Sequence, residues 1–214
     1  MRAAQTREAD LTARARIRDA AIESFATEGF AASFRTIAER AEVSPGLITH
    51  HFGSKDALRA ACDAEVLDRY HRLKSEVVHD PSGYLLEHLA TPGHAAVLLV
   101  YMLRALHAGG EGARTFLDSL TDHVRAVMAQ SVAAGLIKPS RDEESRNRYL
   151  TAQTMGGMLV QLLLAPDQSP DAFVASLHAQ QRDTILPTLE LYTEGLLATP
   201  TLLDDYVRHL STTA

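Results

Sequence analysis

The segment 33–58 constrains the fold most, because it predicts two short helices joined by a very short turn. The first helix is expected over 34–41, with Ser33 as its N-cap, since a serine hydroxyl accepts a hydrogen bond from a free backbone N–H at a helix start. The second is expected over 45–52, where Pro45 occupies the first helical position and its missing N–H does no harm. This spacing indicates a helix-turn-helix, whose second helix lies in the major groove of DNA.

The second helix of the pair has an apolar inner side and a small, polar outer side. Ile48 and Phe52, four residues apart, are expected to face inward. Gly46 permits a close approach of the backbone, Leu47 can touch a thymine methyl group, and Thr49 can bond a base edge or a phosphate. The predicted DNA contacts lie on this helix and at the two neighbouring helix starts: Ser33, Arg35, Thr36, Ser44, Pro45, Gly46, Leu47, Thr49, His50, His51 and Lys55.

The remaining sequence also predicts helices and no strands, so the expected fold class is all-α. A flexible arm over 1–9 precedes a helix over 10–28, which Gly29 closes. Ser44 and Ser54 are expected to cap the helices that follow them, and the helix after Ser54 runs on to a break at 80–83. Further helices are expected at 84–90, 93–108, 111–135, 142–164, 170–197 and 200–210, with Pro187 kinking or dividing the helix that contains it.

The organisation suggested by these patterns is a DNA-binding domain followed by a larger helical domain. Residues 1–56 are assigned to the helix-turn-helix domain and residues 57–214 to the larger helical domain, whose expected role in ligand binding and dimerisation is implied by the family resemblance that the N-terminal motifs carry. The net charge of −6 argues against nucleic acid only at first sight, since residues 1–60 carry +1 and residues 61–214 carry −7. Phosphate contact depends on the local basic surface, so the acidic second part does not exclude DNA binding.

The sequence offers no sign of a secreted or membrane protein. Its one cysteine, Cys62, excludes a disulfide framework within one chain and is expected to be buried. The first twenty residues lack the apolar run of a signal peptide, and the longest apolar stretch, at 95–103, is far shorter than the roughly 20 residues that span a bilayer. A cytoplasmic location without membrane contact is therefore expected.

Catalytic and metal-binding patterns are absent from the sequence. It contains no Gly-x-Ser-x-Gly elbow, no Walker loop and no dinucleotide-binding glycine pattern, so neither an enzyme nor a cofactor is expected. His50 and His51 are adjacent and cannot share one face of a helix, so no metal site is expected there. We interpret them as groups that face DNA, with a hydrogen bond inside the core as the alternative for His51. The acidic run at 142–144 is favourable at a helix start.

Five motifs around the helix-turn-helix carry a family resemblance. They are Ile-Arg-Asp-Ala-Ala at 17–21, Phe-Ala-Thr-Glu-Gly-Phe at 25–30, Thr-Ile-Ala-Glu-Arg-Ala at 36–41, Val-Ser-Pro-Gly-Leu-Ile at 43–48 and His-Phe-Gly-Ser-Lys-Asp-Ala-Leu at 51–58. In this order and spacing, they resemble the N-terminal domain of TetR-type (TetR/AcrR) one-component repressors. The match covers about residues 10–60.

The resemblance implies an all-α homodimer that binds a palindromic operator and releases it when a small molecule binds the C-terminal helices. The many Leu, Met and Ala residues favour an apolar or amphipathic effector. Two positions depart from the family pattern: Glu42 stands where Gly is common, and Thr49 where Tyr is common. A left-handed backbone at Glu42 would cost on the order of 1–2 kcal/mol. The alternative is therefore a helical dimeric module that binds a ligand or a protein and has lost specific DNA binding.

The C-terminal candidates rest on weaker patterns. The middle helices mix apolar bulk with polar tips, as ligand sites do, and the predicted ligand contacts are Tyr101, Met102, Arg104, His107, Phe116, Leu120, His123 and Met155. Core or surface positions are the alternative for each. Adjacent glycines inside a helix cost about 1 kcal/mol each, which suggests close packing of helices. The predicted dimer contacts are Met155, Gly156, Gly157, Leu159, Leu163, Phe173, Leu177, Ile185 and Leu189, with packing inside one subunit as the alternative.

Overall fold

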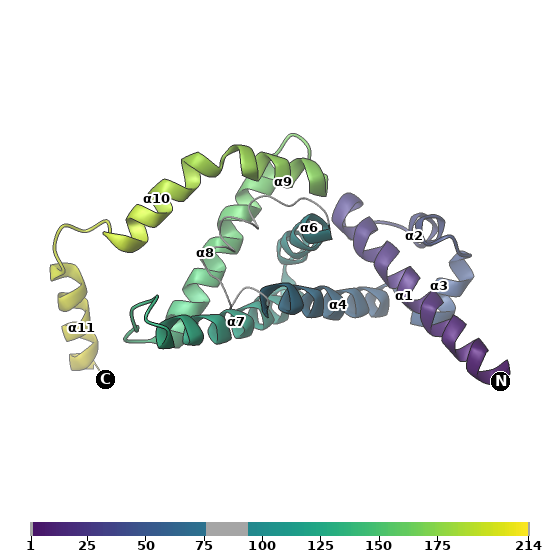
Figure 1. Cartoon of the computed structure of the whole chain (residues 1–214), viewed down its shortest axis with the longest axis horizontal. Coiled ribbons are helices and arrows are strands. Elements are labelled where there is room, and N and C mark those ends of the chain that lie inside the picture. Colours follow the sequence, from purple (N-terminus) through teal and green to yellow (C-terminus); the bar gives the residue numbers. More distant parts are fainter. Residues whose placement is uncertain (1, 76–93, 214) are drawn as a thin grey trace. The chain divides into compact units, whose positions relative to one another are not determined.

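A computed structural model describes residues 2–75 and 94–213 of the chain, and every regular element in these ranges is an α-helix. The all-α fold class is confirmed. The helices, labelled as in Figure 1, are α1 (Arg2–Glu28), α2 (Phe34–Ala41), α3 (Pro45–Phe52), α4 (Lys55–Ser75), α6 (His94–His107), α7 (Gly110–Ala133), α8 (Glu143–Leu164), α9 (Pro170–Ala179), α10 (Gln181–Thr193) and α11 (Thr201–Thr213). The helix predicted at 84–90 and the break at 80–83 lie outside the described residues. Within the described ranges, no helix is both long and apolar enough to cross a membrane.

The N-terminal helices begin and end close to the predicted residues, with one exception and one difference in capping. Helix α1 begins at Arg2 and includes the segment predicted as an arm, because residues 2–9 are good helix formers without Gly or Pro. The Ser33 hydroxyl accepts a hydrogen bond from Thr36 N, and Ser54 Oγ accepts one from Ala57 N at 3.1 Å. Ser44 precedes α3 without a side-chain cap, since it is the Ser44 carbonyl that accepts from Leu47 N at 3.0 Å.

Helix α1 is the centre of the N-terminal core. It packs against α2, α3 and α4, which follow it in sequence, and also against the more distant α6. The largest fully buried side chains of these helices include Ile17, Phe25, Ile37, Ile48 and Leu58. Cys62 is buried as predicted, and burial raises the pKa of its thiol to about 12.

Helices α6, α7 and α8 pack against one another and form the next layer (Figure 1). Helix α7 buries Phe116 and Leu120, and α8 buries Thr151, Met155 and Leu162. Helix α6 also contacts α1 and α4, so the N-terminal helices and the middle helices share one continuous core.

The chain divides into two compact units, residues 1–175 and residues 176–214. The predicted boundary at residues 56/57 is a functional assignment and stays a prediction. The single helix predicted at 170–197 is wrong: it is divided into α9 and α10 at Gln180, where the backbone turns to φ −89° and ψ 3°. Pro187, expected to cause the break, lies inside α10. Helices α10 and α11 belong to the second unit.

Candidate nucleic-acid interface

The turn between α2 and α3 is a tight helix ending built on a left-handed residue. Glu42 has φ 55° and ψ 46°, and it is the residue at which glycine would be free of strain. Val43 N donates to Ala38 O at 3.0 Å, and Glu42 N donates to Glu39 O at 3.3 Å. These two bonds form a Schellman motif, which satisfies two of the carbonyls left open at the end of α2. The turn therefore has the geometry of a helix C-terminus that usually carries glycine, but the left-handed residue is Glu42.

We expect Glu42→Gly to raise the free energy of unfolding by about 1 kcal/mol, because glycine adopts the left-handed region without a Cβ penalty. Urea unfolding followed by circular dichroism measures the change. Gly46→Ala, at an exposed position of α3, is the matched control for the effect of a glycine on backbone entropy. It should raise the free energy of unfolding by a similar amount. A Glu42→Gly variant that is less stable than the parent would contradict strain at this turn.

Helix α3 buries one side and exposes the other, as predicted. Ile48 is 0% exposed and Phe52 is 8% exposed, so both anchors face the core. Leu47 and His51 are half-buried. The exposed residues of the helix and its cap are Ser44, Pro45, Gly46, Thr49 and His50. This leaves small and polar groups on the outer side, which is the surface that a recognition helix presents to a groove.

Two cationic residues stand at the helix starts beside α3. Arg35 is 84% exposed and pairs with Glu39 at 3.0 Å on the same helix. An exposed pair of this kind contributes little, so a phosphate can compete for the guanidinium. Lys55 is the first residue of α4, directly after the Ser54 cap, where backbone N–H groups also favour an anion. Ser33 is exposed and Thr36 is half-buried, and their hydroxyls lie 3.1 Å apart.

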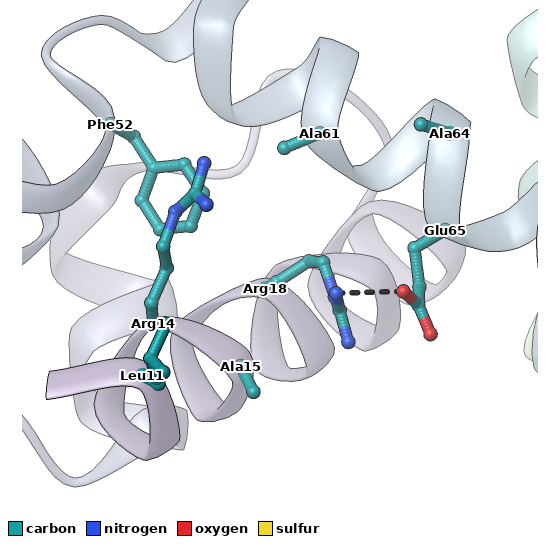
Figure 2. Close-up of a pocket in the computed structure, with 8 residues that line it drawn as sticks. All are labelled: Leu11, Arg14, Ala15, Arg18, Phe52, Ala61, Ala64 and Glu65. Atoms are coloured by element: carbon teal, nitrogen blue, oxygen red, sulfur yellow. Dashed lines mark ion pairs between the residues drawn. The ribbon is translucent and has the colours of Figure 1, made fainter. Parts of the chain in front are cut away.

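Arg14 is a candidate residue of this interface that the sequence interpretation missed. Its guanidinium lies 5.1 Å from the ring centroid of Phe52, the last residue of α3 (Figure 2). This pair forms one end of a groove of about 410 Å³ between α1 and α4, where Arg18 also pairs with Glu65 at 2.7 Å. Spacing along α1 places Arg14 and Arg18 on one face, but it does not indicate which partner helix that face meets.

Helix α6 is joined to α1 and α4 by polar contacts. The Arg104 guanidinium donates to Ala26 O at 2.9 Å and to Thr27 O at 3.2 Å, both in the last turn of α1. The Tyr101 hydroxyl donates to Asp63 Oδ1 of α4 at 2.6 Å. Burial raises the pKa of Asp63 and that of Tyr101, and it lowers the pKa of Arg104. Tyr101 and Asp63 therefore depend on each other for a hydrogen bond, and Arg104 depends on the two carbonyls of α1.

Most of the predicted ligand contacts lie in the core or at this junction. Tyr101 and Arg104 hold α4 and α1, and Met102, Phe116 and Leu120 are buried among the helices. His107 is exposed, and the ring of His123 lies 5.5 Å from that of Tyr70. Only Met155 among them lines the apolar groove of about 330 Å³ on α7 and α8. Within the described ranges, no group of three or more His, Cys, Asp or Glu side chains is placed to hold a metal ion.

The predicted dimer contacts fall into an exposed set and a buried set. On α8, Gly156 and Gly157 are exposed, Leu163 is 48% exposed, Leu159 is half-buried and Met155 is buried. A Cβ added at either glycine would meet no described atom within 4 Å. Phe173 is fully buried in its own chain, which is the competing core interpretation, while Leu177 and Ile185 are half-buried and Leu189 is exposed.

Comparisons with known proteins agree with this architecture. Residues 17–62 match the family of bacterial regulatory proteins, tetR family, and residues 93–198 match the tetracyclin repressor-like C-terminal domain. The chain is 42% identical over 194 residues to the HTH-type transcriptional regulatory protein RaaS of Mycobacterium tuberculosis (strain ATCC 25618 / H37Rv), covering 90% of both proteins.

Solved structures share the fold. Salmonella enterica GusR is 25% identical with a TM-score of 0.50, over 82% of this chain and 96% of that one. A putative TetR-family transcriptional regulator from Rhodococcus sp. is 22% identical with a TM-score of 0.55, over 81% of this chain and 98% of that one, and this likeness concerns the fold alone. The two domain matches and the 42% identity to a regulator establish that this chain belongs to the TetR family of transcriptional regulators.

Proposed function

We propose that this regulator is a cytoplasmic, homodimeric repressor that binds a palindromic operator and is released by a small apolar or amphipathic effector. The observation that carries the proposal is the surface of α3. Its anchors Ile48 and Phe52 are buried, while Gly46, Thr49 and His50 remain exposed on the outer side. A short helix fixed from behind, with small polar groups in front, suits the reading of base edges.

The junction at α6 supports regulation by an effector. Arg104 and Tyr101 bond α1 and α4, so a movement of α6 would be passed directly to the two helices that carry α2 and α3. A ligand shifts such an equilibrium only by as much as its affinities for the two states differ. The apolar groove on α7 and α8, next to α6, is the candidate place for that difference.

The exposed glycines of α8 support a dimer. Gly156 and Gly157 lower helix stability, and in the described part of the chain no neighbour needs their small size. Gly156 and Leu163 are seven residues apart and share a face of α8, which suits a close approach of a helix from another copy. Gly156 also lines the apolar groove, so the effector site would border this dimer surface. Two copies would place two α3 helices on two half-sites, which explains the expected palindrome.

Selection from a random pool of double-stranded DNA at about physiological salt tests the proposal. An enriched palindrome is the expected result, and it supplies the site for a screen of effectors that release it. A folded, dimeric protein that enriches no sequence would instead favour a helical binding module without an operator.

Arg35→Ala and Lys55→Ala are each expected to weaken binding to the selected site and to reduce the salt slope by about 2, because each removes one phosphate contact from each subunit of the proposed dimer. The melting temperature should change little, since both side chains lie at helix starts outside the core. Fluorescence anisotropy at several salt concentrations measures both quantities. Lys138→Ala, an exposed lysine between α7 and α8, is the control. Parental affinity in both variants would exclude these two contacts.

A further inference from the structure

The turn of the helix-turn-helix is held from outside by an arginine of α1. Arg16 Nη2 donates to Ala41 O at 2.7 Å and lies 3.4 Å from Glu42 O. The Schellman bonds at this turn use the carbonyls of Ala38 and Glu39, whereas Ala41 O, the last carbonyl of α2, accepts from Arg16. One guanidinium therefore serves the last carbonyl of α2 and the left-handed residue itself.

We propose that Arg16 is a positioning residue for the recognition helix, and that it acts through the strained turn at Glu42. This inference rests on the proposed reading of DNA by α3. Helix α3 begins at Pro45, three residues after Glu42, so the backbone direction at Glu42 sets the direction of α3. A cation is also favourable at the carboxyl end of a helix, where the free carbonyls carry partial negative charge.

A second arginine shows why the role of Arg16 is distinct. Arg40, in the last turn of α2, donates to Ser24 Oγ at 2.9 Å and lies 3.7 Å from Glu28. That contact holds the body of α2 against α1. Arg16 instead reaches past the end of α2 to the turn, so its loss should release the turn while α2 stays in place. A glycine at position 42 would keep the left-handed turn without help.

The first test needs no DNA. In Arg16→Met, which keeps an unbranched apolar stem and removes the guanidinium, hydrogen exchange of the Glu42 and Val43 amides should become about tenfold faster, because a bond from a charged donor is lost. Exchange in the middle of α7 should stay the same. Arg208→Met removes an equal charge from the exposed surface of α11 and should change neither region. Unchanged exchange at Glu42 and Val43 would overturn the proposal.

The second test uses the DNA sequence that the parent protein selects. Arg16→Met should lower affinity about tenfold while the slope of affinity against salt stays that of the parent, since no phosphate contact is removed. Adding Glu42→Gly should recover part of the lost affinity. A salt slope reduced by about 2, one contact for each subunit of the proposed dimer, without recovery by Glu42→Gly, would make Arg16 a phosphate contact and overturn the positioning role.

The two tests separate this inference from the proposed function. Parent protein that enriches a DNA sequence, together with an Arg16→Met variant that exchanges and binds like the parent, refutes the role of Arg16 alone. If Arg16→Met exchanges faster at the turn but the parent protein enriches no DNA sequence, DNA reading by α3 is refuted, and with it the positioning role. The contact of Arg16 with the turn then still stands.

Discussion

Ile48→Asp is expected to abolish specific DNA binding by unfolding the N-terminal helices, whereas Thr49→Asp is expected to abolish it in a protein that stays folded. Ile48 is 0% exposed, and an unpaired carboxylate at a buried position costs several kcal/mol, a large part of a typical stability of about 5–15 kcal/mol. Thr49 is exposed, and a surface substitution changes stability by about 0.5 kcal/mol or less. There the new charge faces the phosphates of the groove and repels them.

Thermal melting by circular dichroism, with anisotropy on the selected DNA, distinguishes the two causes. Thr49→Ala is the matched control, because it removes the hydroxyl without adding charge and should lose far less affinity than Thr49→Asp. An Ile48→Asp variant that melts like the parent would contradict the burial of the anchor. A Thr49→Asp variant that binds like the parent would contradict the outer face of α3 as the DNA contact.

The burial of Ile48 and the exposure of Thr49 could be predicted from the sequence, because the signals that place them are local. Ser33 marks the start of α2 and Pro45 the start of α3, and both helices begin where these residues place them. Spacing of four residues then assigns Ile48 and Phe52 to the core, as the structure confirms. Glu42 stands where glycine is common in the family, and its backbone is left-handed in the structure.

The long-range contacts could not be predicted in the same way. Arg14, Arg16 and Arg104 are polar residues within helices. The residues near them in sequence do not indicate which carbonyls or rings they contact. The ligand contact of Arg104 stays a prediction, and the structure places its guanidinium at the end of α1. The break at Gln180 has no glycine or proline, so local rules placed it at Pro187 instead.

Arg104→Met is expected to lower the free energy of unfolding by about 2 kcal/mol. The substitution removes a charged donor, so two carbonyls at the end of α1 lose their hydrogen bonds. The effect should exceed the loss of a surface charge, since the guanidinium lies in a partly buried junction where burial already lowers its pKa. Urea unfolding should show a lower midpoint with an unchanged slope. Affinity for the selected DNA should remain, because the side chain does not belong to the outer face of α3.

Arg114→Met is the matched control, because Arg114 is an exposed arginine of α7 at the edge of the apolar groove. It removes the same charge and should change the free energy of unfolding by about 0.5 kcal/mol or less. Equal losses in the two variants would show that net charge, and not the contact with α1, explains the result. A larger loss in Arg104→Met makes α6 part of the support for α1. In that case, an effector that displaces α6 must work against this contact, which makes the Arg104→Met protein the sensitive background for an effector screen.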